Sequence, residues 1–316
     1  MQWGISKTQH YVDLPGLRMH YVEAGPPDGA PIILLHGFPE FWYSWRLQIP
    51  ALAAAGYRVI APDQRGYNLS SKDGPYDIAT LTADIAHLQD ALGISTSHIV
   101  GHDWGGAVAW AFAAAYPERT DRLVILNAPH LNAYEDTVRR HPRQLLKSWY
   151  ILFFQLPRLP EWSLRAGDYA VLRRAFARVP HMTAADIARY RDAWARPGAL
   201  SATVGWYRAV ARGLIAHRGN LPTLRVASST LVIWGERDAF LDRACNDTLP
   251  RYVPDLRISY LPASHWVQLD RPDEVNRLLL AFLHDPDSQN RGLRDASGQM
   301  YHGLIRGILH RARFDT

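Results

Sequence analysis

The sequence has little cysteine, little lysine and no long apolar run. The single cysteine, Cys245, excludes an internal disulfide framework and a thiolate metal cluster. The apolar runs are short, for example Leu123 to Leu126 and Ile151 to Phe154, whereas roughly 20 consecutive apolar residues are needed to span a bilayer. The N-terminal segment MQWGISKTQH lacks the apolar core of a secretory signal. We therefore expect a cytoplasmic protein with no membrane partner.

The basic residues are scattered along the chain. The 316 residues include 35 basic and 30 acidic side chains, and only three of the basic ones are lysines. The nearest clusters, Arg139 to Arg143 and Arg173 to Arg178, are interrupted by apolar or proline residues. No nucleic-acid motif accompanies them, so we expect no nucleic-acid partner. With 47% hydrophobic and 21% charged residues, the composition is typical of a folded globular protein that is long enough to bury a large core.

From about residue 10 to 128, short β-branched runs alternate with helical stretches. This alternation predicts parallel strand pairing and a doubly wound α/β sheet. The expected strands are a hairpin over Tyr11–Glu23 that turns at Pro15-Gly16, followed by Pro31–Leu35, Tyr57–Ala61, His98–Gly101 and Leu123–Leu126. The expected helices are Leu81–Leu92 and Gly106–Tyr116.

From about residue 130 to 221 the strand pattern is lost, and helical segments such as Ala184–Ala195 and Ala202–Ala216 dominate. Strands return at Thr230–Trp234 and Arg257–Leu261, before a closing helix over Pro272–Leu283. A helical insertion at the ligand-binding edge of such a sheet is typical of a lid. We therefore predict an α/β core from residues 1–129 and 221–284, a helical cap from residues 130–220, and a tail from residues 285–316. The tail has one weakly amphipathic run, Tyr301–His310, and we expect it to be poorly ordered or packed on the surface.

Residues 101–106 (GHDWGG) follow a predicted strand and precede a predicted helix, which is the layout of a nucleophile elbow. Gly101 and Gly105 flank the central residue, Asp103, and permit a sharp turn. An aspartate attacks an sp³ carbon that bears a leaving group and forms an alkyl ester, which water must then hydrolyse. The alternative interpretation of Asp103 is a helix N-cap.

Candidates for the base and its supporting acid follow the later strands. His265 lies between the last strand and the last helix, where an α/β hydrolase places its catalytic histidine, and Asp238 follows the strand Thr230–Trp234. Asp238 would hold one ring nitrogen of His265 and stabilise its cationic form. Both residues could instead be structural. The rival acids are Glu236, Asp242 and Asp270, whereas Asn127, after the preceding strand, is not an acid.

Two backbone N–H groups could stabilise an oxyanion. Residues 36–39 (HGFP) end the strand Pro31–Leu35, and the N–H of Phe38 would complement that of Trp104. Alone, this glycine–proline segment could be a simple turn. The sequence has no HExxH motif, no GxGxxG motif and no Walker loop, so we expect no metal and no cofactor.

Together these motifs resemble those of the soluble epoxide hydrolases of the α/β-hydrolase fold, the branch with an aspartate nucleophile, over roughly residues 10–284. The matching stretches are residues 36–46 (HGFPEFWYSWR), 63–70 (DQRGYNLS), 101–106 (GHDWGG), 234–238 (WGERD) and 264–266 (SHW). In the cap, residues 148–157 (SWYILFFQLP) and 206–208 (WYR) resemble the segments that bear two tyrosines of this family, here Tyr150 and Tyr207.

The resemblance implies an enzyme that converts a small apolar epoxide and water into a vicinal diol through an ester on Asp103. Tyr150 and Tyr207 would donate hydrogen bonds to the epoxide oxygen and act as the general acid, and a phenol is protonated at neutral pH. The alternative role of the two tyrosines is packing in an aromatic cap. The sequence leaves the oligomeric state open, a homo-oligomer included.

Two other classes of protein stay open as alternatives. Haloalkane dehalogenases share the Trp after the Asp, but they usually carry Asn where this chain has Phe38, and they lack the paired tyrosines. Fluoroacetate dehalogenases usually carry Arg at the position of Trp104. A homologue that only binds a ligand would form no covalent intermediate.

Overall fold

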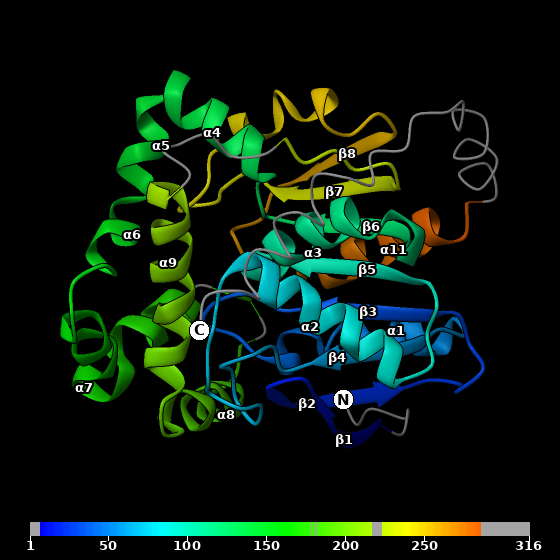
Figure 1. The fold of residues 1–316 in the computed structure, drawn as a ribbon, viewed down its shortest axis with the longest axis horizontal. Coiled ribbons are helices and arrows are strands. Elements are labelled where there is room, and N and C mark those ends of the chain that lie inside the picture. Colours follow the sequence, from blue (N-terminus) through cyan, green and yellow to red (C-terminus); the bar gives the residue numbers. More distant parts are fainter. Residues whose placement is uncertain (1–6, 178, 181, 217–222, 286–316) are drawn as a thin grey trace.

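The computed structural model describes residues 7–177, 179, 180, 182–216 and 223–285, and its centre is an eight-stranded sheet (Figure 1). The strands are β1 (Lys7–Leu14), β2 (Leu17–Ala24), β3 (Pro31–Leu35), β4 (Arg58–Pro62), β5 (Ser97–His102), β6 (Thr120–Leu126), β7 (Ser229–Gly235) and β8 (Leu256–Leu261). Their order is β1-β2-β4-β3-β5-β6-β7-β8. The pairings β1–β2 and β2–β4 are antiparallel, and all the others are parallel. The predicted α/β-hydrolase fold is thereby confirmed.

Helices cover both faces of the sheet, and the strands supply apolar side chains to each face in alternation. In β3, Ile32 and Leu34 pack in the same core cluster as side chains of α1 (Ile49–Ala54) and α11 (Pro272–Leu283). Ile33 and Leu35 pack in a second cluster, with α2 (Ile78–Ala91) and α3 (Trp104–Ala115). Both faces are therefore buried, which explains why β3 is an uninterrupted apolar run. The other described helical elements outside the region between β6 and β7 are α10 (Val267–Asp270) and the 3₁₀ turns Trp42–Trp45, Pro117–Arg119, Arg243–Asn246 and Leu249–Arg251.

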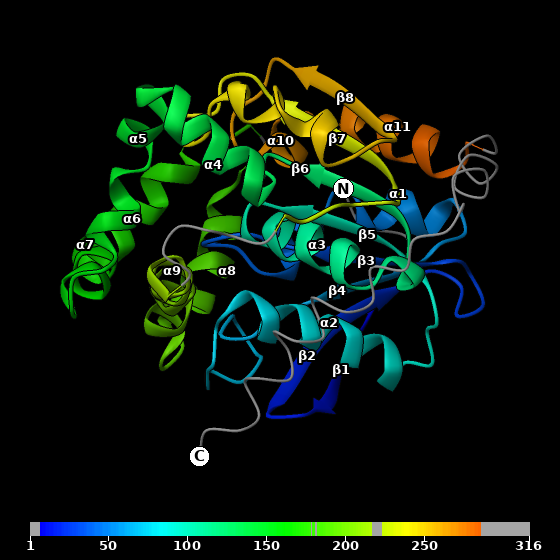
Figure 2. The same cartoon turned by 45° about the horizontal axis from the view of Figure 1, so that its top comes forward.

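All the described elements between β6 and β7 are helices, and we call residues 131–216 the cap. They are α4 (Leu131–Arg140), α5 (Pro142–Lys147), α6 (Trp149–Phe153), α7 (Leu159–Phe176), α8 (Ala184–Ala195) and α9 (Ala199–Ala216). Both views place the cap beside the end of the sheet at which the parallel strands finish (Figures 1 and 2). The exact limits of 130 and 220 stay a prediction. Within the described residues, no helix combines the length and the apolar character needed to cross a membrane.

The predicted strands are all present, β3 with its predicted bounds and the others with shifted ends. The helices show why ends are hard to place. Helices α8 and α11 match their predicted bounds, whereas α2 begins at Ile78 and not at Leu81 because Asp77 caps it, accepting a hydrogen bond from the Thr80 N–H (3.0 Å). Helix α9 begins at Ala199, three residues before its predicted start. The short helix α1 and the cap helices α4–α7 had no predicted bounds. The tail run Tyr301–His310 lies outside the described residues.

Helix α3 begins at Trp104, two residues before its predicted start, although Gly105 and Gly106 are weak helix formers. A side chain at Gly105 would collide with the carbonyl group of Leu35 in β3. The close approach of α3 to the sheet therefore requires glycine, and this tertiary contact outweighs the local helix preference.

A buried ion pair fixes the loop after β4 to α2. The Arg65 guanidinium donates to both carboxylate oxygens of Asp84, at 2.7 and 2.6 Å, and both side chains are buried. Arg65 also donates to the carbonyl oxygens of Gly16 (2.9 Å) and Asp73 (3.2 Å). Burial raises the pKa of Asp84, although Arg65 counteracts part of that effect. The ionised form of the Asp84 carboxylate therefore depends on the charge of Arg65.

We predict that Arg65→Leu lowers the free energy of unfolding by about 3–5 kcal/mol at neutral pH, because it leaves the Asp84 charge buried without a partner. Urea denaturation measures this loss. The control is Arg191→Leu, which removes an ion pair with Asp168 (3.3 Å) in which both side chains are about half exposed, and which costs about 1 kcal/mol or less. Equal losses in the two variants would contradict the role given to the buried pair.

Candidate active site

Asp103 occupies the sharp turn between β5 and α3. Its backbone has φ 51° and ψ −121°, a positive φ that costs a non-glycine residue about 1–3 kcal/mol. A side chain at Gly101 would collide with the carbonyl of Gly105, so the turn closes only because both positions are glycine. This is the strand–turn–helix layout expected of an elbow. The Asp103 side chain forms no capping hydrogen bond to α3, which argues against the N-cap interpretation.

The carboxylate of Asp103 has two partners from distant parts of the chain. The backbone N–H of Phe38 donates to Oδ1 at 2.8 Å. On the other oxygen, His265 Nε2 lies 3.4 Å from Oδ2. Trp104 is the first residue of α3, so its N–H has no acceptor within the helix. Three of the predicted site residues, Phe38, Asp103 and His265, therefore meet here, and Trp104 directly follows Asp103 in the sequence.

The second ring nitrogen of His265 contacts Asp238. The Nδ1 atom lies 2.7 Å from Asp238 Oδ2, and both side chains are buried. The rival acids are engaged elsewhere: Glu236 pairs with Arg243 (3.0 Å), Asp242 accepts from the Ala244 N–H (3.1 Å), and Asp270 accepts from the Ser264 N–H (2.5 Å). The hydrogen bond of His265 thus distinguishes Asp238 from its neighbours in sequence. Its catalytic role stays a prediction.

Asn127, at the end of β6, holds the carboxylate of Asp238 in place. The Nδ2 group of its side chain donates to Asp238 Oδ2 at 2.7 Å. The Oδ1 atom of the same side chain accepts from the Gly235 N–H at 2.8 Å. The N–H groups of Phe240 and Leu241 donate to the other carboxylate oxygen, at 2.7 and 3.0 Å. Asn127 is an amide and not an acid, and its sequence position gave no indication of this supporting role.

A buried polar cluster supports the backbone of His265. His102 Nε2 lies 2.9 Å from the carbonyl oxygen of His265, and its Nδ1 lies 2.8 Å from Glu40 Oε2. The side-chain amide of Gln268 donates to Glu40 Oε1 (3.4 Å), and its nitrogen lies 3.2 Å from His102 Nδ1. A carbonyl oxygen can only accept, so the Nε2 of His102 carries a proton. No sequence signature marks this cluster, although Glu40 and His102 lie within residues 36–46 and 101–106.

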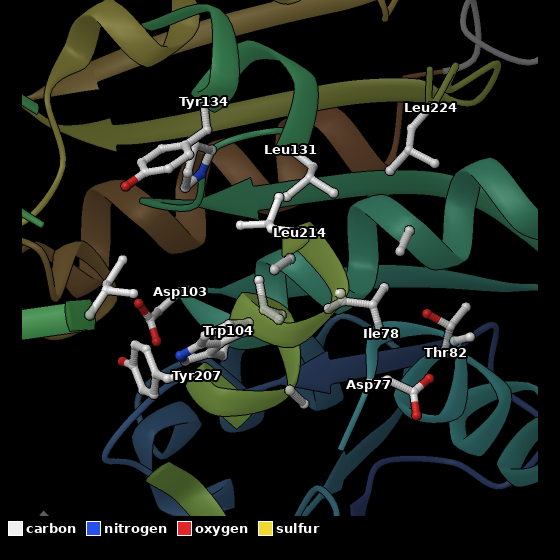
Figure 3. A pocket seen from close by; sticks show the side chains of 18 of the residues that line it. Asp77, Ile78, Thr82, Asp103, Trp104, Leu131, Tyr134, Tyr207, Leu214 and Leu224 are labelled. Carbon is white, nitrogen blue, oxygen red and sulfur yellow. The ribbon is translucent and has the colours of Figure 1, made fainter. Parts of the chain in front are cut away.

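The two cap tyrosines lie beside Asp103. Tyr150 in α6 and Tyr207 in α9 have ring centroids 6.0 Å apart. The Tyr207 ring lies 4.8 Å from that of Trp104 (Figure 3). Tyr150, Tyr207 and Asp103 line one cavity of about 390 Å³, a size typical of small-molecule sites. The arrangement brings two phenols from the cap and one carboxylate from the core into the same space.

Helix α5 ties the cap to the loop that carries Asp238. The Lys147 ammonium donates to the carbonyl oxygen of Asp238 at 2.9 Å. The side chain of Gln144 donates to the carbonyl of Phe240 (3.1 Å) and accepts from the N–H of Asp242 (2.8 Å). The cap and the supporting acid are therefore joined by direct hydrogen bonds.

The charges at the site shift the pKa values of its groups. Burial lowers the pKa of His265, but the charge of Asp238 and the hydrogen bonds with Asp103 and Asp238 outweigh burial and raise the pKa to about 10. Burial raises the pKa of Asp103, yet its hydrogen bond with cationic His265 brings the pKa below the ordinary value. Burial, followed by the charge of Asp103, raises the pKa values of Tyr150 and Tyr207 well above the usual range. At neutral pH the site thus holds an imidazolium between two carboxylates, next to two neutral phenols.

The described residues offer no metal centre and no cysteine nucleophile. In this part of the chain, no group of three or more His, Cys, Asp or Glu side chains is arranged to hold a metal ion. Cys245 is buried, and burial raises the pKa of its thiol to about 12, so almost none of it is the reactive thiolate at neutral pH. Among the described residues that line the cavity, Asp103 is the candidate nucleophile that the elbow presents.

The chain is similar to known proteins over most of its length. The profile of the family described as alpha/beta hydrolase fold matches residues 30–272. An AB hydrolase superfamily protein, YfhM, of Bacillus subtilis is 43% identical over 86% of this chain and 96% of its own length. Human epoxide hydrolase 4 is 40% identical over 85% of this chain and 76% of its own length. The crystal structure of a Bacillus megaterium epoxide hydrolase in complex with an inhibitor superposes with a TM-score of 0.80, at 29% identity, over 87% of this chain and all of that chain.

We predict that Asp103→Asn lowers the pKa of His265 from about 10 toward the ordinary imidazole value near 6.5, because the variant removes one of the two negative partners. An NMR titration of the His265 ring nitrogens measures the change. Glu236→Gln is the control. Glu236 pairs with Arg243, so this variant removes a negative charge that is not a partner of His265. The coupling between the two residues would be refuted by a His265 pKa that is the same in Asp103→Asn as in the unchanged protein.

Proposed function

Because the chain belongs to the epoxide hydrolase family of α/β hydrolases, we propose that it converts an epoxide and water into a vicinal diol through an ester on Asp103. One observation carries the proposal: a carboxylate held between the Phe38 N–H and His265 lines the same cavity as two phenols. A nucleophile, a base and an acid for the leaving oxygen are then all available to one substrate.

In the first step, Asp103 opens the epoxide ring. Oδ1 accepts the hydrogen bond from the Phe38 N–H, and Oδ2, which His265 Nε2 approaches at the longer distance of 3.4 Å, is the attacking oxygen. A bond forms between Oδ2 and one epoxide carbon while the carbon–oxygen bond of the ring breaks. The electron pair of that bond goes to the epoxide oxygen, which becomes an alkoxide unless it is protonated as it leaves.

Tyr150 and Tyr207 supply that proton. Burial and the nearby Asp103 charge keep both phenols protonated at neutral pH, so each is a hydrogen-bond donor throughout the approach of the substrate. An alkoxide is far more basic than a phenolate, so proton transfer from a phenol is favourable once the ring opens. The phenolate then regains a proton, and the imidazolium of His265 is the nearby source.

Ester formation makes His265 available as a base. The negative charge of Asp103 is one cause of the raised pKa of His265, and esterification removes it. The histidine can then release its proton, which balances the proton given to the alkoxide. Neutral His265, oriented by Asp238, next takes a proton from a water molecule that attacks the ester carbonyl carbon.

The N–H groups of Phe38 and Trp104 stabilise the tetrahedral oxyanion formed on Oδ1. When this intermediate collapses, the bond between the carboxyl carbon of Asp103 and Oδ2 breaks, and its electron pair goes to Oδ2. The proton of the hydroxyl added from water passes to this oxygen, so the diol leaves with the original Oδ2 atom and Asp103 returns to a carboxylate. The oxygen from water stays on Asp103. Isotopic oxygen from the solvent therefore enters Asp103 in the first turnover and the diol only in later ones.

We predict that His265→Gln accumulates the ester, because the variant can still be alkylated but has no base for hydrolysis. Incubation with styrene oxide should raise the intact mass of the protein by the mass of the epoxide, and peptide mapping should locate the adduct on Asp103. The double variant Asp103→Asn/His265→Gln is the control and should gain no mass. An adduct on another residue, or no adduct with any epoxide, would overturn the covalent scheme.

We predict that the double variant Tyr150→Phe/Tyr207→Phe forms diol from styrene oxide about 10²- to 10⁴-fold more slowly, the usual contribution of general acid catalysis. The control is Tyr134→Phe, because Tyr134 lines the same cavity but its hydroxyl is bonded to Ser148 (2.7 Å). Release of halide from a haloalkane, measured in parallel, distinguishes a dehalogenase, whose leaving group needs no proton. Halide without diol in the unchanged protein would make these tyrosines packing residues.

A further inference from the structure

The cavity continues well beyond the reacting groups. Asp103, Trp104 and Tyr207 lie at one end of the residues that line it, and Asp77 and Thr82 of the α2 region lie at the other (Figure 3). The space is therefore elongated, with the nucleophile close to one end.

The floor of this space is one face of α3. Ala107, Ala111 and Ala115 all line the cavity and follow one another at intervals of four residues. Each interval corresponds to about 6 Å along a helix, at 1.5 Å per residue. Because their side chains are single methyl groups, the three alanines leave a continuous strip open along the helix. The walls on either side are apolar, with Ile78 from α2 and Leu214 from α9 among them.

Packed rings surround Phe38, whose backbone N–H contacts Asp103. The ring of Phe38 lies 5.8 Å from that of Phe154 and 5.5 Å from that of Tyr207, and the rings of Phe154 and Tyr207 are 4.8 Å apart. Neither Phe38 nor Phe154 is among the residues that line the cavity. The described lining therefore extends from Asp103 along α3, which favours an epoxide at the end of a chain.

The charge of the lining restricts the tail of the substrate. Among the described residues that line the cavity, the charged ones are Asp77 and Asp103, and both are acidic. The carboxylate of Asp77 is already used to cap α2, where it accepts from the N–H (3.0 Å) and the hydroxyl (2.9 Å) of Thr80. The described lining contains no cation for an anionic tail, and a carboxylate there would meet negative charge in an apolar space.

We propose, on the basis of the function proposed above, that the substrate class is uncharged terminal epoxides with an unbranched alkyl chain that lies along α3. Ala107, Ala111 and Ala115 set the chain length that the enzyme accepts. An extended alkyl chain advances about 1.25 Å per carbon, as bonds of 1.5 Å at tetrahedral angles require. One interval between the alanines therefore corresponds to roughly five methylene groups.

The test is a chain-length series on the unchanged protein, Ala111→Leu and Ala115→Leu. The substrates are the terminal epoxides of butene, dodecene and hexadecene, and the quantity is kcat/KM for diol formation. Ala111 lies two intervals from Asp103, which the ten-carbon tail of dodecene oxide reaches, and Ala115 lies three intervals away, which takes about fourteen carbons. We expect Ala111→Leu to lower kcat/KM about tenfold or more for the two longer epoxides, and Ala115→Leu to lower it for hexadecene oxide alone. Butene oxide should react equally with all three proteins, which also reports intact folding and chemistry.

Ala91→Leu is the matched control, because Ala91 is exposed at the end of α2 and does not line the cavity. It should leave the chain-length profile unchanged. If Ala111→Leu does not fold, the chain-length profile of Ala115→Leu alone tests the proposal, because Ala115 is half-buried at the end of α3. Equal losses on all three epoxides, or unchanged profiles in both variants, would overturn the role of the alanines.

A second arm tests the charge of the tail. Dodecene oxide is compared with the terminal epoxide of the same length that ends in a carboxylate, and we expect the uncharged compound to have the higher kcat/KM. An equal or higher value for the carboxylate would overturn the uncharged class. Failure of the underlying function gives a different result: the unchanged protein would then form no diol from any epoxide, and His265→Gln would form no ester on Asp103.

Discussion

The site depends on one unfavourable backbone conformation, the positive φ of Asp103. It is tolerated because the glycines on either side allow α3 to approach the sheet so closely that no relaxed alternative fits. The carboxylate is thereby held at the end of β5, within reach of the Phe38 N–H from the β3 loop and of His265 from beyond β8. Three segments far apart in the sequence thus converge on one strained residue, and the sheet supplies the rigidity that maintains the strain.

In the proposed mechanism, the same carboxylate couples the two chemical steps through charge. While Asp103 is ionised, its charge is one cause of the raised pKa of His265, so the histidine keeps its proton and is not a base. Alkylation would neutralise the carboxylate and weaken the hold on that proton. The order of the two proposed steps would therefore follow from electrostatics within one hydrogen-bonded group.

The sequence predicted the sheet and the elbow well because both depend on local patterns. Apolar runs marked the strands, and the glycines around Asp103 marked the turn. The cap helices from α4 to α7 were not bounded. Helices α5 and α6 have only six and five residues, and the backbone of α7 leaves helical geometry from Ala166 to Tyr169, so no sustained helical period marks these three. The role of Asn127 was also missed, since an amide that supports an acid has no signature until the fold brings β6 beside the loop of Asp238. Tyr150 and Tyr207 were identified by family resemblance and not by any physical feature of the sequence.

The hydrogen bonds from α5 to the loop of Asp238 have a consequence for protein engineering. Since Gln144 and Lys147 hold that loop from the side of the cap, the cap is not an independent module that can be exchanged between homologues to change their substrates. A chimera that replaces the cap without these two side chains would loosen the support of the acid as well as reshape the cavity. Grafts are better confined to the cap residues that follow α5, because such exchanges leave this connection in place.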